Sequence, residues 1–257
     1  MGFLFGEFIY RPLYNLLILA YSIIPYHDFG LAIILVTMLL KFLLVPLSKK
    51  QIQAQKKMQE LQPKIKEIQE KYKKDKEKQS RALMDFYKEN KANPFSGCLP
   101  TVFQLVFLIA IYRVLFDISK AGLVIDGKEL YSFVANPGQI NQYFLGIVDL
   151  SRKLNLSHLT IGVIPQLVLV VLAAAAQYFQ IKMLMPAMAP TNKNTSGSDV
   201  SQIMSKQMLY LGPLMTLFIG VQFPAGLALY WLISTAFTII QQRLLMKERS
   251  VVVGNKA

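Results

Sequence analysis

The residue with the clearest potential for chemistry in this 257-residue chain is Lys41, a cation inside a run of apolar residues. The run extends from Phe29 to Leu47, and its only other polar side chain is that of Thr37. At about 1.5 Å per residue, this length of helix reaches roughly 28 Å, which is close to the thickness of the hydrocarbon core of a bilayer. The run therefore predicts a membrane-spanning helix that carries a positive charge.

An ammonium near the middle of a span costs about 2.5–3.5 kcal/mol on insertion scales, so Lys41 requires compensating contacts. One alternative is snorkelling, in which the side chain extends to the interface near Ser48. The other is a polar stripe of Thr37 and Lys41, one helical turn apart, that faces a hydrated cavity. Helical side chains tilt toward the N-terminus of their helix, which directs Lys41 away from Ser48 and favours the cavity.

Other polar side chains interrupt the remaining apolar runs. Three glutamines in the run after His158 fall within about 60° of one another on a helical wheel, and three hydroxyl groups in the last run recur every four residues. Each could be an interhelical hydrogen bond, worth about 0.6 kcal/mol on average, but their spread over several runs also fits one shared hydrophilic groove. The candidates are Gln104, Gln166, Gln177, Gln180, Tyr230, Trp231, Ser234 and Thr238.

The residues needed by several enzyme classes are missing. The two histidines, His27 and His158, fall near the ends of predicted spans, and neither HExxH, nor GxSxG, nor a pair of intramembrane aspartates occurs. Cys98 is the only cysteine, so the chain can form neither an internal disulfide nor a cysteine-rich metal site. We therefore expect no catalytic residue, no metal and no cofactor.

The composition indicates which elements position these residues. Hydrophobic residues make up 53% of the chain in long runs, which is typical of an all-α, polytopic membrane protein. The formal charge of +13 could indicate nucleic-acid binding. The cations, however, lie mainly between the apolar runs, where their distribution determines membrane orientation instead.

Residues 1–28 precede the first predicted span. They are apolar and rich in aromatic residues but contain Glu7, Arg11 and Pro12, so we expect an amphipathic helix that lies in the membrane interface. An uncleaved signal or a sixth span is the competing interpretation. No basic segment precedes the run and no small-residue cleavage site follows it, which argues against a removed signal peptide.

Residues 48–93 form the only long hydrophilic segment, with fourteen Lys and Arg against seven Asp and Glu. Leu61, Ile65, Ile68 and Tyr72 follow a heptad-like spacing, and a second helix is expected at about residues 79–91. The segment therefore predicts a charged helical hairpin with its tip near KKDKEK. Such a hairpin could dock a partner or an incoming chain, or it could only fix the orientation of the protein.

Residues 94–246 contain four further predicted spans, which makes five in total: about Phe95–Phe116, Leu159–Ile181, Gln207–Val221 and Ala225–Leu245. The segment 117–158 carries four basic and four acidic residues, 182–206 carries three against one, and the chain from Arg243 carries four against one. The positive-inside rule then predicts an outside N-terminus, an outside loop 117–158, and a cytoplasmic hairpin, loop 182–206 and tail 247–257.

Four stretches of the sequence resemble the membrane protein insertases of the YidC type, which have mitochondrial Oxa and chloroplast Albino relatives. They are TMLLKFLLVPLSKKQ (37–51), LQPKI (61–65), LMDFYKENKANPFSGCLPTVFQ (83–104) and FPAGLALYWLISTAFTIIQQ (223–242). The resemblance covers roughly residues 8–246. It implies five core helices around a hydrophilic groove that is open to the cytoplasm and to lipid, with a cytoplasmic hairpin after the first of them.

By this resemblance, Lys41 occupies the position at which bacterial members usually have a groove arginine. Thr37, Gln104 and Trp231 match polar or aromatic groove positions, whereas Gln222 stands where many members have tryptophan. Lysine keeps the charge of arginine but lacks its planar arrangement of five donors. The resemblance thus implies a groove that attracts an anionic group without gripping it at two points.

The implied function is a membrane protein insertase and chaperone in the bacterial plasma membrane, acting without bond chemistry. Its implied partners are nascent membrane protein clients and the lipid bilayer, together with the Sec translocon, the ribosome or the signal recognition particle pathway. No direct nucleic-acid specificity is expected.

Two other functions fit parts of the pattern. A small-anion transporter or channel could use Lys41 as its binding charge, but the sequence lacks the inverted repeat that many transporters have, and Pro46 and Pro213 do not occupy corresponding places. A scaffold that assembles complexes without inserting any chain cannot be separated from an insertase by sequence.

Overall fold

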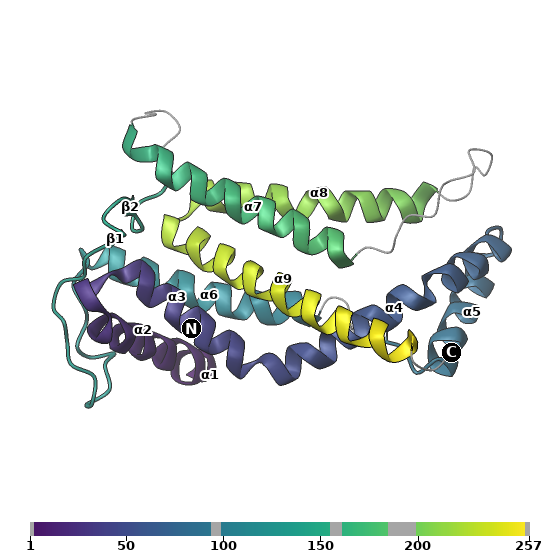
Figure 1. Ribbon diagram of the computed structural model, residues 1–257, viewed down its shortest axis with the longest axis horizontal. Helices are drawn as coiled ribbons and strands as arrows, with labels where there is room; N and C mark the ends of the chain where they lie inside the picture. Colours follow the sequence, from purple (N-terminus) through teal and green to yellow (C-terminus); the bar gives the residue numbers. More distant parts are fainter. Residues whose placement is uncertain (1–2, 94–98, 155–160, 185–198, 255–257) are drawn as a thin grey trace.

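A computed structural model describes residues 3–93, 99–154, 161–184 and 199–254 of the chain. The described residues are mostly helical, with a single two-stranded sheet, and they form an elongated bundle (Figure 1). The helical fold class agrees with the sequence prediction. Several element boundaries differ from it, each for a local physical reason.

The N-terminal region is helical from Phe3 to Ile23, as α1 (Phe3–Phe5), the π-helical turn η1 (Gly6–Tyr10) and α2 (Arg11–Ile23). The π turn ends two residues before Pro12, whose missing N–H interrupts the regular hydrogen-bond ladder. The whole stretch is long and apolar enough to cross a membrane. One face of α2 is buried, so this region packs as part of the bundle.

The first predicted span is shorter than expected. The helix α3 covers Phe29–Leu43 rather than Phe29–Leu47, and α4 begins at Val45 after a bend of 66°. Pro46 explains the bend, because proline cannot donate an N–H to the carbonyl of Phe42 and its ring clashes with that carbonyl in a straight helix. At its other end α3 is capped by Asp28, which accepts a hydrogen bond from the N–H of Leu31 at 2.9 Å.

The predicted hairpin consists of α4 (Val45–Lys71) and α5 (Lys76–Glu89), joined by a short turn. It therefore begins three residues earlier than predicted, and its second helix starts at Lys76 rather than near residue 79. Asp75 caps α5 by accepting a hydrogen bond from the N–H of Lys78 at 3.0 Å. Of the predicted heptad seam, Ile65 is buried.

The remaining predicted spans correspond to helices with different ends. The helix that corresponds to the predicted span Leu159–Ile181 is preceded by the 3-10 turn η4 (Ile161–Val163). The helices of the last two predicted spans extend well beyond the predicted limits. Residues 94–98, 155–160, 185–198 and 255–257 lie outside the described part of the chain. His158 and the predicted starts of two spans, at Phe95 and Leu159, are among these residues. The helices are α6 (Leu99–Lys120), α7 (Ile164–Leu184), α8 (Asp199–Gln222) and α9 (Ala225–Gly254).

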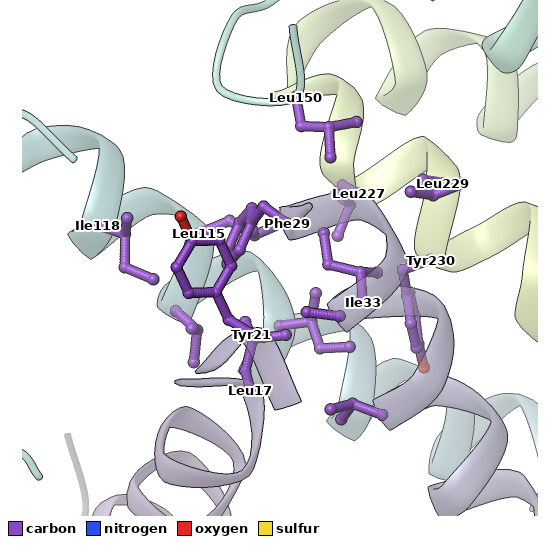
Figure 2. Close-up of a cluster of buried hydrophobic side chains, with 14 of the residues drawn as sticks. Leu17, Tyr21, Phe29, Ile33, Leu115, Ile118, Leu150, Leu227, Leu229 and Tyr230 are labelled. Atoms are coloured by element: carbon purple, nitrogen blue, oxygen red, sulfur yellow. The ribbon is translucent and has the colours of Figure 1, made fainter. Parts of the chain in front are cut away.

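The helix α9 is central to the arrangement. It runs between the pair α7 and α8 on one side and the group α2, α3 and α6 on the other, while the hairpin projects from one end of the bundle (Figure 1). Buried side chains from four helices and from the segment near Leu150 converge at the opposite end (Figure 2). The most extensive interhelical contacts join α7 to α8 and to α9, and α3 to α9.

That opposite end is covered by the segment between Ala121 and Leu154, which includes the strands β1 (Tyr143–Phe144) and β2 (Val148–Asp149). The buried side chain of Asn15 holds it from α2, since its amide nitrogen donates to the carbonyl of Glu129 at 2.8 Å and its oxygen accepts from the N–H of Tyr131 at 2.6 Å. Similar bonds join Tyr14 to Asp126, Tyr21 to Asn141 and Asp28 to Leu145.

Length and composition identify two described helical stretches that could cross a membrane, Phe3–Ile23 and Ile161–Met183. A third candidate is the bent pair α3 and α4, and the part of α8 from Leu209 to Gln222 is a shorter apolar helix. These features agree with a helical membrane protein. The arrangement of five spans, and the choice between an interfacial and a spanning N-terminal helix, stay predictions.

Candidate functional site

Lys41 lies where α3, α6 and α9 meet. Its ammonium donates to the side-chain oxygen of Gln104 on α6 at 3.2 Å and to the hydroxyl of Thr238 on α9 at 3.1 Å. The side chain is half-buried. Lysine has three N–H donors, so two are bonded to neutral groups of the described residues and one is left for another acceptor.

Gln104 connects this cluster. Its oxygen accepts a second hydrogen bond from the hydroxyl of Ser234 at 3.0 Å, and its nitrogen donates to the hydroxyl of Tyr230 at 3.5 Å. Thr238 donates its own proton to the carbonyl of Ser234 at 2.8 Å, which leaves its lone pairs to accept from Lys41. The four-residue spacing on α9 therefore places three hydroxyl groups beside one lysine and one glutamine.

Thr37 is buried one turn before Lys41, but it does not join this cluster. Its hydroxyl donates to the carbonyl of Ile33 within α3 at 2.6 Å. Such a bond satisfies the hydroxyl inside its own helix, as is common for threonine in helices. Thr37 thus lies on the expected face without a described bond to Lys41.

A second polar contact lies on the other side of α9, against α7. The side-chain oxygen of Gln177 accepts from the indole N–H of Trp231 at 3.0 Å and from the hydroxyl of Thr235 at 3.5 Å. Trp231 and Thr235 are each one residue after Tyr230 and Ser234, which rotates them by about 100° around the helix. The two polar groups therefore face different neighbours of α9.

The three glutamines predicted to share a face of α7 do not form one site. Gln166 is buried at the end of α7 nearest β2, where it donates to the carbonyl of Asp149 at 2.8 Å. Gln177 is eleven residues further along, about 16 Å, and bonds to α9. Gln180 is half-buried and has no hydrogen bond to another residue in the described part of the chain.

Sequence reasoning missed one contact near the site. Gln241 on α9 donates to the hydroxyl of Ser48 on α4 at 2.8 Å, next to the bend after α3. Gln241 follows Thr238 by three residues, so it continues the polar edge formed by Tyr230, Ser234 and Thr238. The helical spacing could have included it, but its partner depends on the bend at Leu44.

The charges around Lys41 are unbalanced. None of the four ion pairs among the described residues involves Lys41, and no described group of three His, Cys, Asp or Glu could hold a metal ion. The hairpin formed by α4 and α5 carries excess positive charge at its end of the bundle. There, the N–H of Lys78 holds the pKa of Asp75 below its ordinary value, and burial raises the pKa of Tyr87.

Comparisons with known proteins show which chains share this sequence. The chain is 35% identical over 221 residues to a protein of Geotalea daltonii, and 33% identical over 222 residues to one of Fusobacterium nucleatum, both named membrane protein insertase YidC. The alignments cover 86% of this chain in each case, but 34% of the first relative and 87% of the second. A protein of the same name from Streptomyces avermitilis is 34% identical, covering 89% of this chain and 53% of the relative.

This chain spans only about a third of the length of several of the relatives it matches, including the one from Geotalea daltonii. The shared name describes the placement of proteins in membranes rather than the making or breaking of bonds, in agreement with the prediction of a non-enzymatic protein. A family of 60Kd inner membrane proteins matches residues 20–251, which is most of the chain. The chain therefore belongs to this family, whose members include the YidC insertases.

Proposed function

We propose that this protein is a membrane protein insertase and chaperone that helps small membrane proteins to enter and fold in the bilayer. The observation that carries the proposal is the setting of Lys41, a cation bonded to neutral side chains and to no carboxylate of the described chain. A cation held in this way keeps its attraction for an external anion. The names of the relatives support the same function.

The proposed site is a hydrophilic groove lined by Thr37, Lys41, Gln104, Gln166, Gln177, Gln180, Tyr230, Trp231 and Ser234. Moving a short hydrophilic segment across a bilayer is slow because its polar groups lose their water. A groove that brings polar groups and one charge into the membrane shortens the apolar path. The acidic residues of a client would be drawn toward Lys41, and its apolar span would leave sideways into lipid.

The proposed topology follows the distribution of charge. Residues 48–93, 182–206 and 247–257 would be cytoplasmic, and the N-terminus and residues 117–158 would lie outside, around five spans. The segment from Ala121 to Leu154 is tied to α2, α7 and α9 by hydrogen bonds, which supports a closed outer end. The end of the bundle from which the hairpin projects would receive the client.

The proposed partners are nascent membrane protein clients and the lipid bilayer. The hairpin is the segment best suited to meet a client first, because it projects from the bundle (Figure 1). It also exposes an excess of basic side chains. The Sec translocon, the ribosome and the signal recognition particle pathway are further partners proposed from the family alone.

The proposal is tested by insertion of a single-spanning client with an acidic outer tail into proteoliposomes that contain only this protein. We compare the parent with Lys41→Arg, Lys41→Ala and Lys41→Glu. We expect Lys41→Arg to retain most of the insertion activity because it keeps the charge. Lys41→Ala should lower the insertion rate about tenfold, which corresponds to about 1.4 kcal/mol. Lys41→Glu should lower the rate further, because its carboxylate repels the acidic client.

Two results would contradict the proposal. If the parent protein inserts the client no better than empty liposomes, the insertase function is wrong. If Lys41→Glu inserts the acidic client as fast as the parent does, the electrostatic role of Lys41 is wrong. Flux of a small anion through the same vesicles, lost in Lys41→Ala, would support the transporter instead. A client with a neutral tail serves as the control for charge.

A further inference from the structure

The polar edge of α9 continues past Lys41 to the root of the hairpin. Tyr230 and Ser234 bond to Gln104, Thr238 accepts from Lys41, and Gln241 donates to Ser48. Every one of these contacts joins α9 to α6, α3 or α4. In the described structure each of these four side chains of α9 is therefore bonded to a neighbouring helix.

Ser48 links this edge to the bend between α3 and α4. Its hydroxyl accepts from Gln241 at 2.8 Å and donates to the carbonyl of Leu44, the residue at the bend, also at 2.8 Å. The bond joins residues 193 positions apart in the sequence and thus fixes α9 to the bend at the root of the hairpin rather than to its tip. Because Ser48 follows the bend at Leu44 by four residues, a change in the angle between α3 and α4 would displace it from Gln241.

Two glutamines next to this contact in the sequence each have a buried amide atom that no described residue bonds. Gln51 lies one turn after Ser48, and Gln242 follows Gln241. The amide nitrogen of Gln51 and the amide oxygen of Gln242 are buried without a partner among the described residues, and the two side chains are only 8% and 2% exposed. Burying a polar group without a hydrogen bond costs free energy, so a hydrogen bond from water or from a polar segment would stabilise both glutamines.

We propose that Ser48 and Gln241 form a latch that closes the hairpin end of the groove, and that a client opens it by supplying polar groups to Gln51 and Gln242. This inference rests on the proposed insertase function, because it names residues that control access to the same groove. Gln241 lies about 4.5 Å beyond Thr238 along α9, on the hairpin side. A segment that arrives from the hairpin therefore meets the latch before it meets Lys41.

Opening can be measured without a client. Ile52 is buried at the root of α4 with 6% exposure, so in a Cys98→Ser background Ile52→Cys reports whether this junction opens. We expect Gln241→Leu to raise the rate of labelling of this cysteine by a water-soluble thiol reagent several-fold. Gln142→Leu is the matched control, because Gln142 is a half-buried glutamine of the covering segment, outside the proposed groove, and this change leaves the rate unchanged. Equal rates in all three proteins would overturn the latch.

The consequence for insertion is measured by locking the contact. Ser48→Cys and Gln241→Cys, again with Cys98→Ser, are joined by a short reducible bismethanethiosulfonate reagent in proteoliposomes. We expect the bridged protein to insert the acidic-tailed client several-fold more slowly than the same sample after reduction. Either single cysteine, treated alike, controls for the reagent.

The two proposals fail in different ways. Equal insertion by bridged and reduced protein, with both above empty liposomes, overturns the latch and leaves the insertase function standing. Faster labelling in Gln241→Leu, together with no insertion by any variant or by the parent, supports the latch as a moving contact and overturns the insertase function.

Discussion

At the scale of single residues, the main finding is a charged side chain held by neutral ones. Lys41 is bonded to an amide and a hydroxyl, so its charge is stabilised but not cancelled. Gln104 makes more of these hydrogen bonds than Thr238 does, because its amide contacts Lys41, Ser234 and Tyr230. Its oxygen is therefore the atom at which the charge of the site is most easily altered.

We expect Gln104→Glu to neutralise the site, because it places a carboxylate about where the amide oxygen lies, 3.2 Å from the ammonium of Lys41. Insertion of an acidic-tailed client should fall to the level of Lys41→Ala, while a neutral-tailed client is less affected. Gln104→Met is the matched control, since it keeps the size of the side chain and the free charge. The measurement is the client insertion rate in proteoliposomes. A Gln104→Glu protein that still favours acidic tails would contradict this assignment.

A separate prediction concerns the stability of the protein when Gly30, near the N-terminal end of α3, is replaced. A Cβ at this position would overlap the ring of Phe144 on β1. We expect Gly30→Ala to lower the thermal stability of the detergent-solubilised protein, by about 1–3 kcal/mol as for other overpacked sites. Phe144→Ala should remove the clash, so the two changes together should cost less than their sum. Strict additivity in melting measurements would show that the ring moves aside without strain.

At the scale of elements, most helices could be predicted, but their ends could not. Apolar runs identified α3, α6, α7, α8 and α9, because a segment buried in lipid must satisfy its backbone hydrogen bonds within a helix. The end of α3 was wrong by four residues, since the run of apolar side chains continues through Pro46 and hides the bend. The caps Asp28 and Asp75 were missed because each is a single residue without a box motif.

The cap of α5 gives a prediction with a pH dependence. The pKa of Asp75 is lowered in the folded hairpin, so its contribution to stability is present above about pH 4 and is lost as the pH falls through its folded pKa. We expect Asp75→Ala to raise amide exchange of residues 76–80 several-fold at pH 7, whereas Asp75→Asn, which can still cap, changes it little. Exchange is measured by mass spectrometry of the whole protein. Equal rates in Asp75→Ala and the parent would exclude the cap as a stabilising contact.

At the scale of the whole molecule, the sequence predicted the class of protein and several of the polar residues that meet at Lys41, but it grouped with them others that lie elsewhere. Of the predicted residues, Ser234 and Tyr230 both bond to Gln104, which bonds to Lys41. Gln166 shares a helix face with Gln177, yet a helical wheel ignores distance along the axis, and Gln166 bonds at the other end. The link between Ser48 and Gln241 could not be predicted, because it depends on the angle of the bend.

The proposed orientation of the molecule can be tested directly. In a Cys98→Ser background, we expect a cysteine at exposed Ser132 to react with an impermeant maleimide added to intact cells whose outer layers have been removed. A cysteine at exposed Arg81 in the hairpin should react only after the membrane is permeabilised. Labelling of both positions from the same side would contradict the charge-based topology.

The buried amide of Asn15 has a consequence for how the chain is made. Its partners on the covering segment lie 114 and 116 residues later in the sequence, so they do not exist when α2 first leaves the ribosome. At about 5–20 residues per second, α2 waits roughly 6–23 s before these groups are synthesised. During that interval the amide nitrogen of Asn15 has only the carbonyl of Arg11 within α2 as a partner, and the amide oxygen lacks its final one. A protein proposed to assist others thus passes through a stage of its own biosynthesis in which assistance is useful.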